Sequence, residues 1–250
     1  MAGGSKRRRR NWLGWFGLFT FLSGLYLLLY PSLWGAVVDQ NIRDNAHNFL
    51  GRKESAPTEP VAILESTEPE ETRPYLELWE DMNVYNHAIY VHRQSGLTCV
   101  NDYQVPSFLL SEYDLPSEVF GVISIPKLDL EMPIFLGATD ENMALGAAVL
   151  SQTSVPIGGE NTNSVIAGHR GYNGASYFRY IPDLQIGDEV MITNLWETLS
   201  YRVTETKIIT PDDVNEILIQ EGNDRITLLT CHPYASGGKQ RYLVICDREL

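Results

Sequence analysis

An uncharged stretch near the N-terminus restricts the folds open to this chain more than any other feature of its sequence. Residues 11–38 contain no Asp, Glu, Lys or Arg, and the basic run KRRRR at 6–10 precedes them. As a helix, the segment Trp12–Tyr30 would be about 28 Å long, close to the thickness of the hydrocarbon core of a bilayer. Aromatic residues, which favour bilayer interfaces, lie towards its two ends: Trp12, Trp15, Tyr26, Tyr30 and Trp34. The pattern predicts a transmembrane anchor over 12–34.

The basic cluster sets the expected orientation of this anchor. Lys and Arg next to a span stay on the cytoplasmic side, so residues 1–11 form a cytoplasmic tail and the rest of the chain lies outside the cell. A cleaved signal peptide is the alternative, but the apolar run is longer than the usual 7–15 residues and no A-x-A site follows it. No second long apolar run is present, which predicts a single-pass protein of the cell membrane.

Charge and cysteine content exclude two classes of partner. The 250 residues carry a net charge of −13 with a pI near 4.8, which argues against nucleic-acid binding because polyphosphates need a basic face. The three cysteines form no CxxC spacing, and the five histidines form no HExxH pattern. We therefore expect no metal and no cofactor.

Between the anchor and the main domain the sequence predicts two helices and a linker. Residues 35–73 combine a short helix, VVDQNIRDNAHNFLGR, ended by Gly51, with an acidic Glu/Pro/Thr/Ser-rich stretch that is too polar to fold alone. Residues 74–117 begin with an amphipathic helix over 75–94. Its apolar face is expected to hold Leu78, Met82, Tyr85, Ile89 and His92. The remainder, 95–117, shows no clear period.

From residue 118 to the end the chain reads as short β-branched strands separated by turns. Two connections, DENMALGAAV and GASYFRYIP, read as helical. The pattern predicts an all-β domain of about 130 residues with short helices, either a closed barrel or a sandwich. The expected strands are 119–125, 132–137, 163–169, 188–194, 198–210, 225–231 and 241–247.

Three residues of this domain could form a nucleophilic site. Cys231 ends an apolar strand, and Arg241 begins the next one after the loop HPYASGGKQ, so a hairpin would bring the guanidinium beside the thiol. His169 closes an earlier strand and is flanked by Gly168 and Gly171. A catalytic thiol needs partial exposure, a proton-transfer partner and a donor to the oxyanion, and these three residues could supply them.

Less specific interpretations compete with this one. A single cysteine is more often a small buried hydrophobe, which fits Cys246 inside the run YLVIC and could also fit Cys231. His232 is a rival base because it adjoins Cys231, but neighbouring side chains of a strand point to opposite faces.

The motif TLLTC, followed by Arg241 and preceded by AGHRG, resembles the signature of the sortases, membrane-anchored cysteine transpeptidases of Gram-positive bacteria. The resemblance covers residues 118–247 and the N-terminal span. It implies a closed β-barrel of about eight strands that cleaves an LPxTG-like sorting signal between Thr and Gly. Cys231 would then be the nucleophile, His169 the general acid and base, and Arg241 the oxyanion donor. Thr230 would support the oxyanion through its hydroxyl group or its backbone.

The subclass implied by TLLTCHPY and IPKLDLEMPIFLGAT is class C, the pilin polymerases, whose acceptor amine is a pilin lysine. Residues 95–117 occupy the place of the lid of that class, although they contain no Asp-Pro-Phe or Asp-Pro-Trp, and no second span precedes Leu250. An accessory sortase that uses a cell-wall precursor is the alternative. A non-catalytic membrane-tethered binding module and a hydrolytic cysteine peptidase are further alternatives. Cys99 lies within the lid segment, and a redox-sensitive contact with Cys231 is a separate hypothesis.

Overall fold

Short strands separated by tight turns close into a barrel in the computed structural model, which describes residues 5–55, 73–97 and 105–249. Eight strands form the barrel within these residues: β1 Val119–Ile125, β2 Leu130–Leu136, β3 Ala147–Val149, β4 Thr162–Ala167, β5 Glu189–Asn194, β6 Thr198–Ile209, β7 Asp224–His232 and β8 Gln240–Arg248. The helices are α1 Ser5–Ser55, α2 Leu76–Val91 and α3 Asp140–Leu145, with 3-10 turns η1 Leu110–Tyr113, η2 Pro126–Leu128, η3 Ile181–Asp183 and η4 Val214–Ile217. The expected barrel is confirmed, and a sandwich is excluded.

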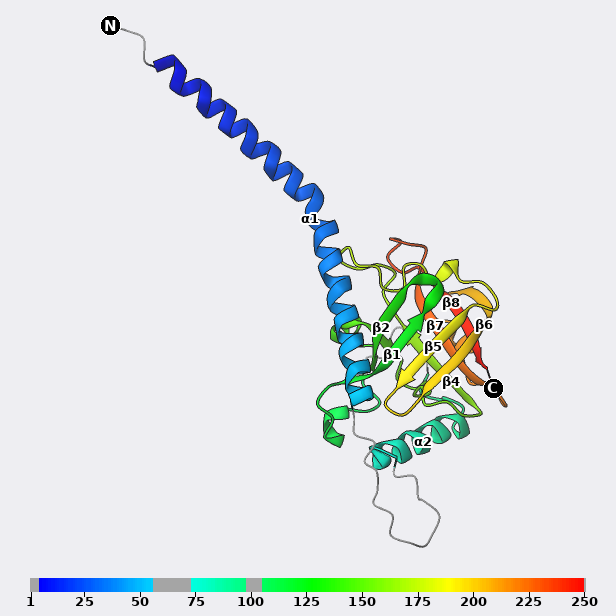
Figure 1. Cartoon of the computed structure of the whole chain (residues 1–250). Helices are drawn as coiled ribbons and strands as arrows, with labels where there is room; N and C mark the ends of the chain where they lie inside the picture. The colour runs from blue at the N-terminus through cyan, green and yellow to red at the C-terminus, as the bar shows by residue number, and fades with distance from the viewer. Residues whose placement is uncertain (1–4, 56–72, 98–104, 250) are drawn as a thin grey trace.

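The order of strands around the barrel decides which residues meet at its ends. The order is β1-β2-β3-β4-β7-β8-β6-β5, and the pairs β2/β3 and β4/β7 are parallel while the others are antiparallel. Parallel neighbours end on the same side of a sheet. The segment after β4 and the loop between β7 and β8 therefore lie at one end of the barrel, opposite α2 (Figure 1).

The central strands of the barrel are buried on both faces, and polar residues such as Asn163 and Ser164 of β4 are buried among the apolar ones. All six residues of β4 are buried, whereas β5 alternates between buried and half-buried positions. The inner faces form the main core. Outside the barrel, η4 and its neighbours cover a second cluster that includes Val165, Leu229 and Leu243. Burial on the outer face thus replaces the alternation expected of a half-solvated strand.

Helix α2 covers the end of the barrel away from the β7–β8 loop. Leu78, Met82 and Ile89 are buried as expected, but His92 is exposed and Tyr85 is only partly buried. Asn86 is buried instead, and its side-chain amide accepts a hydrogen bond from the backbone N–H of Val155 and donates one to the carbonyl of the same residue. A polar residue that pairs with loop backbone cannot be recognised from apolar periodicity alone.

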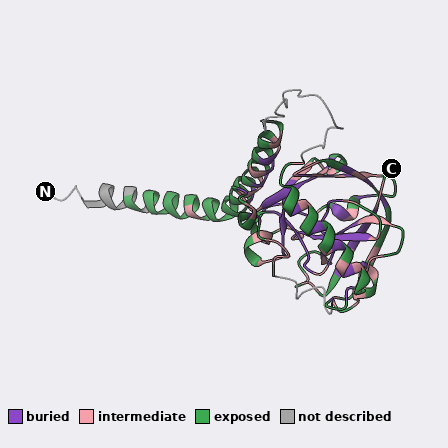
Figure 2. Ribbon diagram, turned by 90° about the horizontal axis from the view of Figure 1, so that it is seen from below, coloured by how far each residue is buried: buried purple, intermediate pink, exposed green. Residues whose placement is uncertain are grey.

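Helix α1 is continuous, where the sequence predicts a span and a separate short helix. Pro31 lies inside it and Gly51 does not end it. Proline removes one backbone donor and bends a helix without always ending it, and Figure 2 shows that α1 changes direction where it reaches the barrel. Its second half packs on β1 and β2 through the buried side chains of Ile42 and Phe49.

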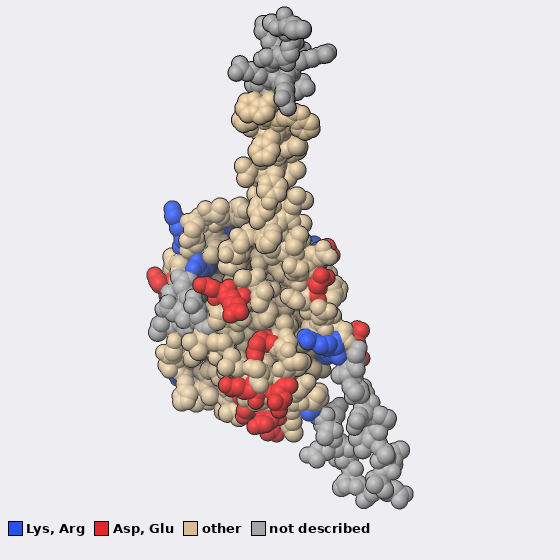
Figure 3. Space-filling view, turned by 90° about the vertical axis from the view of Figure 1, so that its left-hand side faces the viewer, with Lys and Arg blue, Asp and Glu red and all other residues tan. Residues whose placement is uncertain are grey.

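The first half of α1 projects away from the barrel with its apolar side chains exposed. In Figure 3 the described surface of this part carries no charged side chain, and Asp, Glu, Lys and Arg appear only on the domain. Among the described residues, this helix is long and apolar enough to cross a membrane.

Both predicted helical connections need correction. DENMALGAAV contains α3 only as far as Leu145; Gly146 follows, and Ala147–Val149 is strand β3, which pairs with β2 and β4. GASYFRYIP forms turns and the 3-10 turn η3 rather than a helix. Gly174 at φ 85° and Tyr177 at φ 44° take left-handed conformations, which an α-helix does not accommodate.

Candidate active site

Cys231 and Arg241 face each other across the last hairpin of the barrel. The antiparallel register of β7 and β8 pairs these two residues directly, and directly opposite residues have neighbouring side chains on one face of a sheet. Cys231 is half-buried, as a reactive thiol requires. The hairpin predicted from the sequence is thus confirmed, and it places a guanidinium beside the thiol.

Gly238, in the β7–β8 loop, lies between these two groups. A Cβ atom added to it would lie 3.4 Å from the Cys231 Sγ atom and 3.2 Å from the Arg241 Nη1 atom. Its φ of 74° also favours glycine. The absence of a side chain at this position therefore allows the loop to pass close to both groups, a role that the sequence alone does not reveal.

The guanidinium of Arg241 is held rigidly at the rim. Arg241 is only 8% exposed, and its Nη1 atom donates hydrogen bonds to the carbonyl oxygens of Gly238 at 2.6 Å and Gln240 at 3.0 Å. A buried, oriented cation stabilises developing negative charge more strongly than a solvated one, because it needs no reorganisation when that charge forms.

His169 reaches the same end of the barrel from β4. The strand ends at Ala167, two residues earlier than expected, but its parallel pairing with β7 continues as the Gly168 N–H donates to the Leu229 carbonyl at 3.0 Å. The Thr230 hydroxyl then donates to the Gly168 carbonyl at 2.8 Å. These bonds hold the backbone that carries His169 against the strand that carries Cys231.

Thr230 therefore lies beneath the site. The residue is 1% exposed, and the bond to Gly168 occupies the hydroxyl proton. Of the two contributions expected from this residue, the hydroxyl contact with an oxyanion does not fit this geometry. The hydroxyl instead links the strand of the cysteine to the residue before the histidine.

Two tyrosine rings enclose the imidazole of His169. Tyr172 stacks on it with ring centres 4.6 Å apart, and Tyr177 meets it edge-on at 5.6 Å. Burial lowers the pKa of His169 below its ordinary value of 6.5, and the negative charge of Asp140 acts in the opposite direction. The imidazole is consequently biased towards its neutral form, with Asp140 retaining part of its basicity.

Arg170 connects the loop after β4 to the end of β7. Its Nη1 atom lies 2.7 Å from the Nδ1 atom of His232 and 3.3 Å from the carbonyl oxygen of Cys231. Because a guanidinium only donates, the ring nitrogen accepts, and neutral His232 carries its proton on Nε2. Burial, and then the charge of Arg170, lower the pKa of His232. His232 is therefore a structural partner of Arg170, a role that adjacency to Cys231 does not reveal.

Of the other two cysteines, the structure describes only Cys246. Cys246 is fully buried within β8, and burial raises the pKa of its thiol, which confirms its expected role in packing. Cys99 lies outside the described residues, and so does the hypothesis of a contact with Cys231.

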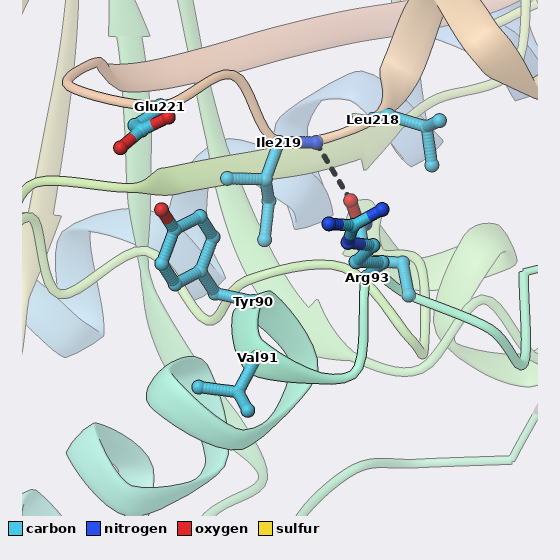
Figure 4. A pocket seen from close by; sticks show the side chains of 7 residues that line it. Tyr90, Val91, Arg93, Leu218, Ile219 and Glu221 are labelled. Atoms are coloured by element: carbon cyan, nitrogen blue, oxygen red, sulfur yellow. Dashed lines mark hydrogen bonds between the residues drawn. The ribbon is translucent and has the colours of Figure 1, made fainter.

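The cavity shown in Figure 4 is not part of this site. It has a volume of about 480 Å³ and lies at the C-terminal end of α2, where the Ile219 N–H donates to the side chain of Gln94 at 2.6 Å. Its lining includes none of the three candidate catalytic residues: Tyr90, Val91, Arg93, Gln94, Leu218, Ile219 and Glu221.

A half-buried thiol, a buried arginine and a histidine thus lie at one rim of a closed barrel, an arrangement suited to a cysteine nucleophile. The model of the sortase domain matches residues 123–249. The chain is 34% identical over 130 residues to sortase A of Bacillus anthracis, an alignment covering 52% of this chain and 60% of that protein.

Solved structures show the same likeness. Sortase C1 of Streptococcus agalactiae has a TM-score of 0.68 at 26% identity, covering 82% of this chain and 97% of that one. Sortase C of Clostridium perfringens has a TM-score of 0.64 at 28% identity, covering 83% and 98%. The chain belongs to the sortase family. It spans about three fifths of the length of the curated relatives it matches.

Proposed function

We propose that this protein is a membrane-anchored cysteine transpeptidase that cleaves an LPxTG-like sorting signal between Thr and Gly and transfers the acyl group to an amine. The observation that carries the proposal is the Cys231–Arg241 pair, with His169 held on the adjoining strand end. One of the similar structures, sortase C of Clostridium perfringens, was solved with a C-terminal cell wall sorting motif. This supports a substrate of the same kind here.

In the proposed acylation step, the Cys231 thiolate attacks the carbonyl carbon of the substrate Thr. Negative charge moves to the carbonyl oxygen, where Arg241 stabilises it. The C–N bond to Gly then breaks as protonated His169 donates its proton to the leaving amine. The products of this step are a thioester on Cys231, a free Gly amine and a neutral His169.

In the second step an acceptor amine attacks the thioester. His169 removes a proton from this amine, a new C–N bond forms, and the C–S bond breaks to regenerate the thiolate. The proposed acceptor is a pilin lysine, because the chain is similar in structure to class C sortases. Attachment to a cell-wall precursor is the second candidate, supported by the 34% identity to a sortase A.

The exposed first half of α1 supports a membrane anchor. In the proposed topology, the basic residues 6–10 lie in the cytoplasm and the barrel lies outside the cell. Cysteine accessibility in whole cells tests this topology: an impermeant thiol reagent is expected to label Cys231 and to fail if the barrel is cytoplasmic.

The central experiment incubates the full-length protein in detergent with LPxTG-type peptides and with either a lysine-bearing pilin fragment or a cell-wall stem peptide. We expect a thioacyl adduct at Cys231 in mass spectra, and an amide or isopeptide product when the correct amine is present. Cys231→Ala should abolish both, whereas Cys246→Ala is the matched control. Hydrolysis alone in the presence of every amine would identify a peptidase, and no adduct with any peptide would favour the binding module.

A further inference from the structure

The juxtamembrane half of α1 contacts the segment that carries His169. The backbone N–H of Ser176 donates to the Asp39 Oδ1 atom at 2.9 Å, and the Ser176 hydroxyl lies 3.4 Å from Oδ2. Asp39 is the first charged residue after the uncharged run. A charge-assisted bond to backbone is stronger than a neutral one, so this carboxylate fixes the loop 169–178 to the helix.

A second contact lies one helical turn earlier. A Cβ atom at Gly35 would overlap with the carbonyl group of Gly174, and one at Gly174 would overlap with the carbonyl oxygen of Pro31. Two glycines thus let the backbones of helix and loop touch. The close approach of helix and loop therefore depends on both glycines. Gly174 also has a φ of 85°, a conformation that favours glycine.

From these contacts the loop leads back to the imidazole. Tyr177, next to Ser176, is 4% exposed, meets the His169 ring edge-on, and donates its hydroxyl to the Ala144 carbonyl at 2.7 Å. The N–H of Phe178 donates to the His169 carbonyl at 2.9 Å. Displacing Ser176 would therefore move the Tyr177 ring, which packs edge-on against His169, and the hydrogen bond between Phe178 and His169.

We propose that Asp39 is a positioning residue for His169, so that helix α1 supports the active site as well as tethering the domain. The proposal rests on the assignment of His169 as the acid and base. In it, the helix that leaves the membrane holds the loop 169–178 in place through Asp39 and the Gly35–Gly174 contact.

The test uses the full-length protein in detergent micelles or nanodiscs and compares Asp39→Ala with Arg43→Ala. Arg43 lies one turn further along the same helix and bonds to Asp129, outside the loop. For Asp39→Ala we expect faster hydrogen exchange at the Ser176 amide. We also expect a His169 pKa closer to 6.5, since loosening Tyr177 hydrates the ring, and a decrease in kcat for peptide transfer of about tenfold with a smaller change in KM. Arg43→Ala should leave all of these unchanged.

Two further variants keep the result interpretable. Asp39→Asn retains an acceptor oxygen and should give an intermediate effect even if the alanine variant folds poorly. Gly174→Ala disturbs the same contact from the loop instead of from the helix, and it should change amide exchange, the His169 pKa and kcat in the same directions as Asp39→Ala. The proposal would be overturned if Asp39→Ala had the wild-type hydrogen exchange at the Ser176 amide, the wild-type His169 pKa and the wild-type kcat. It would also be overturned if Arg43→Ala changed these three quantities as much as Asp39→Ala does. If the unaltered protein transfers no peptide, the proposed function fails, while exchange and titration still decide whether Asp39 positions His169.

Discussion

Two buried threonines on β7 donate their hydroxyl groups to β4 or to the residues that follow it. Thr230 bonds to the Gly168 carbonyl at 2.8 Å, and Thr227 bonds to the Asn163 side chain at 2.9 Å. Replacing either by valine keeps the shape but leaves a buried acceptor without this donor, at a cost of about 1–3 kcal/mol in the free energy of unfolding. We expect both variants to lose stability by this amount in urea titrations.

Only Thr230→Val is expected to slow transfer, because Gly168 directly precedes His169. Thr227→Val acts as the matched control, since it makes the same chemical change in the same strand away from the rim. Single-turnover acylation by a sorting peptide measures the difference. Equal acylation rates would mean that the Thr230 hydroxyl has no part in placing the histidine.

The negative charge of Asp140 opposes the lowering of the His169 pKa. Asp140→Asn is therefore expected to lower that pKa further, which NMR titration of the imidazole would measure. Glu141→Gln, at the next exposed position, is the control.

The lowered pKa of His169 also makes stability depend on pH. Between the folded-state pKa of His169 and 6.5, the folded protein binds fewer protons at this residue than the unfolded chain does. Its contribution to stability is therefore lost as the pH falls below 6.5, and Asp140→Asn should make that loss larger. An unchanged or raised pKa would contradict this account.

Among the secondary-structure elements, the local sequence pattern was sufficient to predict the bounds of a strand where turn residues flank it. The strand predicted at 119–125 has the observed bounds of β1, and the hairpin around Cys231 and Arg241 was also correct. Strand β3 was missed because three small residues, Ala147–Val149, have no periodicity of their own. They form a strand because β2 and β4 supply partners on both sides.

The candidate site was predictable to the extent that its residues belong to a recognisable motif. Cys231, His169 and Arg241 stand at strand ends, and parallel and antiparallel pairing brings them to one rim. The groups that position them were not predictable, because they come from unrelated parts of the chain. Asp39 meets Ser176 across 137 positions, and no sequence period encodes a contact between a helix and an irregular loop.

Arg170 joins the loop after β4 to the end of β7. Arg170→Met removes the donor to His232 and to the Cys231 carbonyl while keeping an apolar body. The pKa of His232 should rise, because the charge of Arg170 contributes to lowering it. Acylation should slow by about tenfold, since losing a charged hydrogen bond costs roughly 1.5–3 kcal/mol where its geometry matters. Arg179→Met, in the same loop and stacked on Tyr234, is the control. If the His232 pKa and the acylation rate were both unchanged in Arg170→Met, Arg170 would not couple the loop after β4 to the end of β7.

For the whole molecule, α1 belongs to the folded domain as well as to the proposed membrane anchor. Ile42 joins the main core, and Phe49 packs with Val119, Val122 and Phe135 of β1 and β2. Lys53 adds a hydrogen bond to the Asn194 carbonyl at 2.9 Å at the far end of the helix. In the proposed topology, a helix held at these points would fix the height and tilt of the barrel relative to the membrane.

Phe49→Ala tests whether helix and barrel unfold together. Truncating a buried phenylalanine costs about 3–5 kcal/mol, and because Phe49 is 4% exposed, we expect a loss in this range in the free energy of unfolding of the full-length protein in detergent. Val37→Ala, at a position of the same helix that is 50% exposed, should change it by less than about 0.5 kcal/mol. Tryptophan fluorescence during denaturant titration would follow both variants. If Phe49→Ala were as stable as Val37→Ala, the helix would be detached from the barrel in solution, and the membrane anchor and catalytic domain would be independent units.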